Sequence, residues 1–358
     1  MGGGILRGAE MGEEVERLEL KFTVTPKQLK EKLRRIAEME NPPAVFLWGK
    51  PGIGKTQIVY QVGEEVKKPV KVMILSLLDP TELKGFVFPD REKRRAEFFP
   101  LNFPDEPFIL FFDEFNTAPT AVQNAAMRIV LEKKIGDYEL PRGSMVVCAG
   151  NRLRDKATVN KLSSAMVNRA LHYSVVPDFE DFKEYWMQKG LPEEVVAYLE
   201  LDTKYLSGEP DIDRPYPSPR AWEMVGRLLQ HGINSVEDIA GIVGEEAAVR
   251  FVAFMKKCTG VGKMVGAILR GEKVYPKTGE VEKSFMLATV LVNKTNRENL
   301  AILLNYALEA PDYMSPYIVL WMKSVLKLGV VTIESLLAPY AVDLTKRFAS
   351  KYKFVIEG

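Results

Sequence analysis

Four short runs of apolar residues constrain the fold of this chain more than any other feature. They cover residues 44–49, 71–77, 108–112 and 145–150. Segments whose apolar residues recur at helical spacing lie between these runs, for example residues 118–134. A strand that is apolar on both faces must be covered on both faces, which is typical of a parallel sheet between two layers of helices. We therefore expect an α/β fold with a parallel sheet over about residues 26–176.

A glycine-rich loop follows the first apolar run. It reads Gly-Lys-Pro-Gly-Ile-Gly-Lys-Thr over residues 49–56, a complete G-x4-G-K-T sequence between a predicted strand and a predicted helix. Glycines let the backbone N–H groups turn towards a phosphate at the N-terminus of the next helix. Lys55 would reach the β- and γ-phosphates, and the Thr56 hydroxyl would bind Mg²⁺. The predicted nucleotide-binding residues of this loop are Gly49, Lys50, Pro51, Gly52, Ile53, Gly54, Lys55, Thr56 and Gln57.

Polar side chains follow two later apolar runs. Asp113 and Glu114 come directly after the run that ends at residue 112, and Asn151 follows the run that ends at residue 150. Ligands of open parallel sheets bind beyond the carboxyl ends of the strands. We expect Asp113 to hold Mg²⁺ through water, and Glu114 to polarise the attacking water as the general base. The amide of Asn151 can hydrogen-bond both this water and the γ-phosphate.

Composition narrows the classes of function. The chain has 49 lysines and arginines against 48 acidic residues, a net charge of +1, so no global field favours nucleic acid or a membrane. No apolar run approaches the roughly 18 residues of a transmembrane helix, and the N-terminus lacks the apolar centre of a signal peptide. Two cysteines, Cys148 and Cys258, exclude a disulfide framework, and two histidines leave little material for a metal site. A reducing cytoplasm fits best.

The chain changes character after Pro177. The following segments have helical spacing and stop at glycine or proline, and a proline-rich bridge covers residues 208–220. We expect a P-loop NTPase core of the α/β class, followed by an all-helical lid and a C-terminal helical region. The predicted boundaries are 1–25 for an N-terminal extension, 26–176 for the core, 177–259 for the lid and 260–358 for the C-terminal region.

Taken in order, five segments resemble the motifs of an AAA+ ATPase of the MoxR type. They are WGKPGIGKT (48–56), FFDEFNTAP (111–119), CAGNR (148–152), SSAMVNRALHY (163–173) and PSPRAWE (217–223), similar to Walker A, Walker B, sensor 1, arginine-finger and sensor 2 motifs. The resemblance covers about residues 26–230. It implies an ATPase that uses ATP and Mg²⁺.

The resemblance implies roles for three further polar residues. Asn151 matches sensor 1, and Arg169 matches the arginine finger that reaches the γ-phosphate of the neighbouring subunit. Arg220 matches sensor 2, which contacts nucleotide and reports its state to the lid. A fixed cation supplied in trans stabilises charge on the transferring phosphoryl group. Ala170 follows Arg169, where the family often has an aromatic residue. Three nearby arginines compete for the finger role: Arg128, Arg152 and Arg154.

Two more segments fit this branch of the family. Residues 78–100 lie where related proteins carry an insert within helix 2 that faces the pore of a hexameric ring. Residues 132–144 resemble the hairpin that precedes sensor 1, with Gly136-Asp137 as its turn. Candidate client contacts in the insert are the basic run 91–95, Phe86 and Phe88.

The resemblance implies a homo-oligomeric ring, most simply a hexamer, that remodels a protein client like a chaperone. Its partner is often a separate protein with a von Willebrand A-type domain. A DNA-directed motor, such as a helicase loader or a restriction-type translocase, is one alternative, and a nucleotide-gated switch with little turnover is another. The acidic pair after residue 112 and the later motifs disfavour a P-loop kinase. ATP is the expected nucleotide and the sequence disfavours a guanine site, although some relatives with a similar Walker B motif use GTP.

Overall fold

The chain divides into two compact units. The computed structural model describes residues 23–84, 86–90, 92, 95–99, 103–135, 138–151, 168–211 and 213–353. Unit 1 comprises Met1–Asp181 and Glu209–Arg214, and unit 2 comprises Phe182–Gly208 and Pro215–Gly358. Residues 1–22 of the expected N-terminal extension lie outside the described residues.

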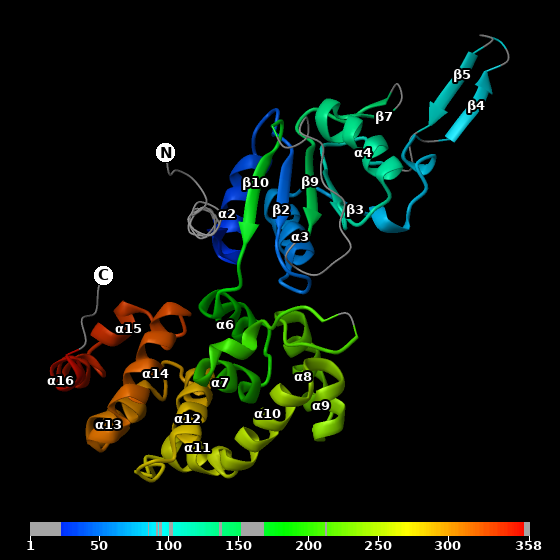
Figure 1. Ribbon diagram of the computed structural model, residues 1–358. Coiled ribbons are helices and arrows are strands. Elements are labelled where there is room, and N and C mark those ends of the chain that lie inside the picture. The colour runs from blue at the N-terminus through cyan, green and yellow to red at the C-terminus, as the bar shows by residue number, and fades with distance from the viewer. Residues whose placement is uncertain are drawn as a thin grey trace, which may run out of the picture. The chain divides into compact units, whose positions relative to one another are not determined.

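Unit 1 is built on a six-stranded sheet in which every neighbouring pair is parallel. The strands are β1 (Thr23–Val24), β2 (Val45–Trp48), β3 (Val70–Ile74), β6 (Ile109–Asp113), β9 (Met145–Gly150) and β10 (Leu171–Val175). Their order across the sheet is β1-β10-β2-β9-β6-β3. The α-helices among the described residues of this unit, before α6, are α2 (Pro26–Ala37), α3 (Lys55–Val66) and α4 (Thr120–Glu132), drawn with the sheet in Figure 1.

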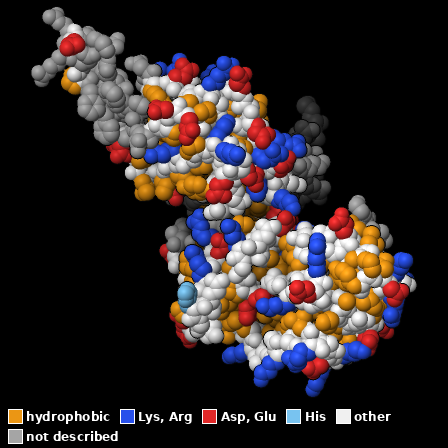
Figure 2. Space-filling view, turned by 180° about the vertical axis from the view of Figure 1, so that it is seen from behind, with side chains coloured by type: hydrophobic (Ala, Val, Ile, Leu, Met, Phe, Trp, Pro, Cys, Tyr) orange, Lys and Arg blue, Asp and Glu red, His pale blue; other side chains and the backbone are white. Residues whose placement is uncertain are grey.

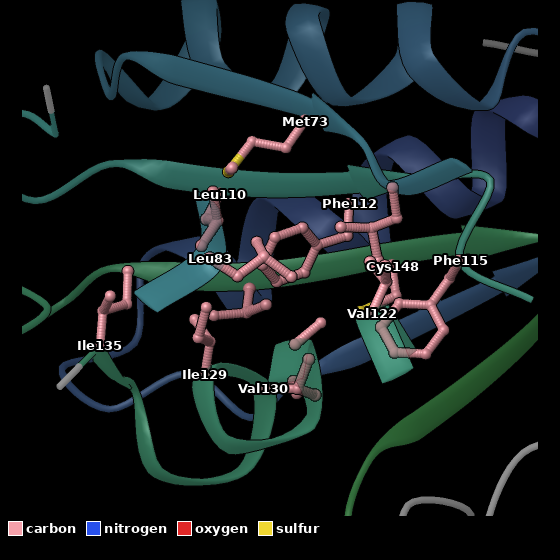
Figure 3. Packing of buried hydrophobic residues seen from close by; sticks show 14 of the residues in the cluster. Met73, Leu83, Leu110, Phe112, Phe115, Val122, Ile129, Val130, Ile135 and Cys148 are labelled. Carbon is pink, nitrogen blue, oxygen red and sulfur yellow. The ribbon is translucent and has the colours of Figure 1, made fainter. Parts of the chain in front are cut away.

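Alternation along the strands divides the core between the two faces of the sheet, because successive side chains of a strand point to opposite faces. Leu110 and Phe112 of β6 pack with Ile129 and Val130 of α4, and Figure 3 shows this cluster between the strands and the helix. On the other face, α3 packs against β3 and β6. Cys148 of β9 is fully buried in the α4-facing cluster, and burial raises the pKa of its thiol, as expected for an inert core residue.

The four predicted strands are all present, and the expected parallel α/β class is confirmed. The run 71–77 is shorter than expected as a strand, because β3 ends at Ile74 and the 3₁₀ helix η1 (Leu75–Leu77) follows. Two strands of this sheet were not predicted. β10 is only partly buried and mixes polar with apolar residues, and β1 has two residues, so neither forms an apolar run.

Two small antiparallel hairpins interrupt the core. In the expected insert, the 3₁₀ helix η2 (Glu82–Lys84) precedes a hairpin of β4 (Phe86–Asp90) and β5 (Arg95–Phe99). The second hairpin pairs β7 (Lys134–Ile135) with β8 (Tyr138–Glu139), where a hairpin was expected before sensor 1. Its expected turn, Gly136-Asp137, lies outside the described residues, as does most of the basic run 91–95.

Every regular element among the described residues of unit 2 is a helix, as expected. Its helices are α6 (Phe179–Gln188, which begins at the end of unit 1), α7 (Glu193–Leu201), α8 (Pro219–Gln230), α9 (Val236–Val243), α10 (Glu245–Lys257), α11 (Val261–Leu269), α12 (Val281–Lys294), α13 (Leu300–Glu309), α14 (Ser315–Lys327), α15 (Ile333–Leu337) and α16 (Val342–Tyr352). Helix α12 packs against α7 and α14. Across the described ranges, no helix is both long and apolar enough to cross a bilayer.

A buried ion pair joins four of these helices. Lys183 of α6 pairs with Glu200 of α7, and their side chains are only 5% and 7% exposed. The Lys183 ammonium also donates to Ser324 Oγ of α14 at 2.8 Å, and Thr289 of α12 donates to Glu200 at 3.4 Å. A charge removed from water must be paired and hydrogen-bonded to be tolerated. The network therefore fixes how the helices on either side of residue 260 pack together.

We predict that Lys183→Met lowers the free energy of unfolding by about 3–5 kcal/mol, because it leaves the Glu200 carboxylate buried without its cation. Adding Glu200→Leu should recover most of this loss. Lys257→Met is the matched control, since the Lys257 side chain is 62% exposed in its pair with Glu282. This substitution should lower the free energy of unfolding by less than about 1 kcal/mol. Urea unfolding followed by tryptophan fluorescence measures this, because Trp186, Trp222 and Trp321 lie in unit 2. A loss for Lys183→Met no larger than the control's would contradict the prediction.

Candidate nucleotide-binding site

The predicted site residues of unit 1, apart from Arg169, lie at or just after the carboxyl ends of parallel strands. Trp48 of β2 pairs with Gly150 of β9, and Ile74 of β3 pairs with Asp113 of β6. Because all these strands are parallel, the loops that follow them leave the sheet at the same edge. The structure therefore brings the glycine-rich loop, the Asp113-Glu114 pair and Asn151 together.

The backbone of the glycine-rich loop depends on its glycines at three points. Gly52 and Gly54 have φ angles of 79° and 90°, in the left-handed region that other residues rarely adopt. At Gly49, a Cβ atom would lie 2.9 Å from the carbonyl oxygen of Val175, so the loop passes too close to β10 for a side chain. Helix α3 begins directly after Gly54, at Lys55, as predicted. The glycines thus allow the loop to curve at the N-terminus of a helix, where backbone N–H groups attract anions.

Lys55 is held inside this loop. Its side chain is buried, at 8% exposure, and its ammonium donates to the carbonyl oxygens of Gly49 at 2.6 Å and Lys50 at 3.1 Å. These contacts fix the cation at the mouth of the loop, where a bound phosphate would meet it. Lys50 itself forms an ion pair with Glu209 at 2.7 Å, whereas Gln57 points to solvent from the first turn of α3.

Thr56 and Asp113 form a direct contact between the loop and β6. The Thr56 hydroxyl donates to Asp113 Oδ2 at 2.8 Å, although the two residues are 57 positions apart in sequence. A hydroxyl and a carboxylate are hard oxygen ligands of the kind that Mg²⁺ prefers. Within the described residues, no group of three or more histidine, cysteine, aspartate and glutamate side chains could hold a metal. A Mg²⁺ site here would rest on these two residues together with phosphates and water, which is the usual arrangement for this ion.

Glu114 adopts a strained backbone conformation, with a φ angle of 54°. Its N–H donates to Asp113 Oδ1 at 2.9 Å, and Thr117 donates to its carbonyl oxygen through both its hydroxyl and its N–H. Its side chain is exposed and accepts a hydrogen bond from the hydroxyl of Ser76 in η1. Ser76 was missed by sequence reasoning, because it lies within an apolar run and nothing in its own segment marks it.

Asn151 lies at the end of β9, half-buried, beside the turn that carries Glu114. The side chain of Asn116 in that turn holds its backbone, donating to the Asn151 carbonyl at 2.6 Å and accepting from its N–H at 3.1 Å. Asn116 is the second residue of this site that sequence reasoning missed. The signal was its place two positions after Glu114 at the tip of a buried strand.

Arg169 lies at the other edge of the sheet. It is exposed in the turn that precedes β10, whose first residue, Leu171, pairs with Val45 at the start of β2. The glycine-rich loop and Arg169 are thus separated by the length of β2, which is about 13 Å for four residues. Among its competitors, Arg128 of α4 pairs with Glu132 at 3.0 Å, while residues 152 and 154 lie outside the described residues.

Arg220 belongs to unit 2. It occupies the first turn of α8, after Ser218, whose hydroxyl accepts from the N–H of Ala221 as the N-terminal cap. Its side chain is exposed. A contact between Arg220 and nucleotide therefore stays a prediction.

Trp48 and His172 join β2 to β10 directly before the glycine-rich loop. The Trp48 indole N–H donates to His172 Nδ1 at 2.9 Å, and the two rings are stacked on Phe46. His172 therefore acts in packing, and its position three residues after Arg169 ties the start of β10 to the strand that carries the loop.

Comparison with known proteins agrees with this geometry in one respect. Residues 45–177 match the model of the ATPase family associated with various cellular activities (AAA). No curated protein matches the sequence significantly.

Several solved structures are similar to the chain at low sequence identity. A putative ATPase from Cytophaga hutchinsonii is 15% identical, with 95% of this chain and 93% of that chain covered and a TM-score of 0.35. RuvB of Thermotoga maritima, a Holliday junction branch migration motor, is 14% identical, with coverages of 93% and 88% and a TM-score of 0.33. NtrX from Brucella abortus in complex with ADP is 11% identical, with coverages of 92% and 68% and a TM-score of 0.35. Scores this low do not establish a shared overall arrangement. Residues 45–177 match the AAA family model, and the parallel sheet with its glycine-rich loop has the P-loop NTPase fold of AAA+ proteins.

Proposed function

We propose that unit 1 binds ATP with Mg²⁺ and hydrolyses its γ-phosphate. The observation that carries the proposal is the 2.8 Å contact between Thr56 and Asp113, which supports a Mg²⁺ site beside the glycine-rich loop. The Lys55 ammonium is held within the loop by the Gly49 carbonyl, and the backbone N–H of Glu114 donates to Asp113. A phosphate cradle, a cation, a magnesium site and a carboxylate are the parts that phosphoryl transfer to water requires.

Each residue has a defined part in the proposed reaction. The loop N–H groups and Lys55 bind the phosphates, and Mg²⁺ held near Thr56 and Asp113 would neutralise charge on their oxygens. Glu114 takes a proton from the attacking water as the new O–P bond forms and the bond to the bridging oxygen of ADP breaks. Ser76 donates to one oxygen of the Glu114 carboxylate, Oε2, and a carboxylate has further acceptor positions for the attacking water.

The position of Arg169 supports assembly into a ring. A side chain at the amino end of β10 is too far from the loop of its own subunit to contact the γ-phosphate there. Its exposure leaves it accessible to a second copy. We infer a homo-oligomeric ring, most simply a hexamer, in which Arg169 completes the site of the neighbour. Arg220 of α8 would report nucleotide state to the helical unit.

We further propose that the ring remodels a protein client, in the manner of a MoxR-type protein, with a separate von Willebrand A-type partner. The β4–β5 hairpin, with Phe86 and Phe88 in β4, is the candidate client contact. A DNA-directed motor gains less support, since charges of both signs are interspersed over the face that Figure 2 shows. Free thiols at Cys148 and Cys258 support a reducing cytoplasm as its location.

We predict that Lys55→Ala weakens ATP binding by at least about tenfold, because charge-assisted hydrogen bonds to phosphate are lost. Lys30→Ala is the matched control, since Lys30 of α2 forms a partly exposed ion pair with Glu65 of α3. This substitution should leave the affinity for ATP unchanged. Isothermal titration with ATP and Mg²⁺ measures both. Equal affinities for the two variants would rule out the phosphate-loop assignment.

We predict that Glu114→Gln keeps ATP affinity within about twofold but lowers the hydrolysis rate by about 100-fold or more, since a general base contributes 10²–10⁴-fold. Glu106→Gln, at an exposed position before β6, is the matched control and should hydrolyse ATP at the normal rate. Phosphate release with saturating ATP and Mg²⁺ is the measurement. If Glu114→Gln turns over as fast as Glu106→Gln, Glu114 is not the base.

A further inference from the structure

Asn116 is a buried polar residue that does not belong to the proposed phosphate site or to the proposed magnesium site. It is 3% exposed, in the turn that follows β6. Both functional groups of its side-chain amide bind one residue: the NH₂ group donates to the Asn151 carbonyl at 2.6 Å, and Oδ1 accepts from the Asn151 N–H at 3.1 Å. Asn151 thus has its backbone N–H and its carbonyl hydrogen-bonded, as a residue in a sheet does, but its partner is a side-chain amide instead of a backbone.

The two hydrogen bonds continue the pairing of β6 with β9 beyond its last residues. The ladder ends with Phe112 opposite Cys148, and the N–H of Phe115 then donates to the Ala149 carbonyl at 2.8 Å. Asn116 adds the next pair, on Asn151. The backbone N–H and carbonyl of Asn151 are therefore both hydrogen-bonded, as in a strand residue, although β9 itself ends at Gly150.

The surroundings of Gly150 make this contact specific. A Cβ atom at Gly150 would lie 2.6 Å from Asn116 Oδ1 and 3.1 Å from Cζ3 of Trp48. Only glycine therefore allows the Asn116 amide to reach the backbone of the next residue. We call the two hydrogen bonds from the Asn116 side chain to the Asn151 backbone the clamp. The clamp requires asparagine and glycine in two segments of the chain that are about 35 residues apart.

We propose that Asn116 is a positioning residue that sets the direction in which the Asn151 side chain leaves the sheet. The inference rests on the proposed function, in which Asn151 and Glu114 hold the same water. The turn that contains Asn116 also fixes Glu114, through the hydrogen bonds from Thr117 to the Glu114 carbonyl. Asn116 thereby sets the base and the amide relative to each other. A displacement of about 1 Å at such a site costs on the order of 100-fold in rate.

The test is a double-mutant cycle on ATP hydrolysis. Asn116→Ala should lower kcat by about 10- to 100-fold and leave ATP affinity within about twofold, because the phosphate loop is untouched. In an Asn151→Ala background, Asn116→Ala should cause no further loss beyond about threefold, since its effect acts through Asn151. Asn124→Ala, on the exposed side of α4, is the matched control with unchanged kcat. Normal kcat for Asn116→Ala, or losses that multiply fully in the double variant, would overturn the proposal.

Hydrogen exchange gives a readout that does not depend on activity. In the nucleotide-free protein, the backbone amide of Asn151 should exchange at least about tenfold faster in Asn116→Ala, while the amides of β9 keep their protection.

If Asn116→Ala does not fold, Asn116→Asp replaces it. This variant keeps the acceptor for the Asn151 N–H but loses the donor to the Asn151 carbonyl. It should lose kcat while the Asn151 amide keeps its protection. Unchanged exchange in Asn116→Ala overturns the clamp. A wild-type protein that hydrolyses no ATP would instead overturn the proposed function and leave the exchange test of the clamp intact.

Discussion

Parallel pairing of four neighbouring strands is the constraint on which the rest of unit 1 depends. Because β2, β9, β6 and β3 run in the same direction, their carboxyl ends meet at one edge, and every polar residue that follows them converges there. Full burial of β6 and β9 on both faces fixes their register, since a slip by one residue would turn each apolar side chain to the wrong face. The contact of Thr56 with Asp113 and the contact of Asn116 with Asn151 are consequences of this register.

Sequence reasoning succeeded where a feature is local. The glycine-rich loop, the helix that begins at Lys55 and the buried strands are all visible as short patterns, and the structure contains each of them. It failed where a feature depends on neighbours in space. β10 mixes polar and apolar residues because it is only partly covered, and Ser76 and Asn116 acquire their roles from the ends of strands that are adjacent in the sheet. No pattern within their own segments encodes that adjacency, whereas the register of the sheet does.

The two edges of the sheet separate two parts of the proposed chemistry. The phosphate loop, the base and Asn151 share the carboxyl edge, and Arg169 lies at the amino edge of the strand next to β2. The stack of Trp48 with His172 lies within one subunit, between the turn that carries Arg169 and the glycine-rich loop. In unit 2, the buried pair of Lys183 with Glu200 plays a comparable part, because it holds α6 and α7 to helices that follow residue 260. Each unit is thus tied together by a few buried polar contacts.

In the proposed ring, Arg169 of a neighbouring copy completes the nucleotide site built on unit 1. Co-expression of Arg169→Ala with Lys55→Ala tests it most directly, because one variant keeps an intact phosphate loop and the other keeps an intact finger. Each variant alone should be nearly inactive. In randomly mixed rings, about one quarter of the interfaces combine both intact parts, so ATP hydrolysis per subunit should recover to about a quarter of the wild-type rate. Mixed assemblies no more active than the separate variants, or full activity of Arg169→Ala alone, would contradict the account.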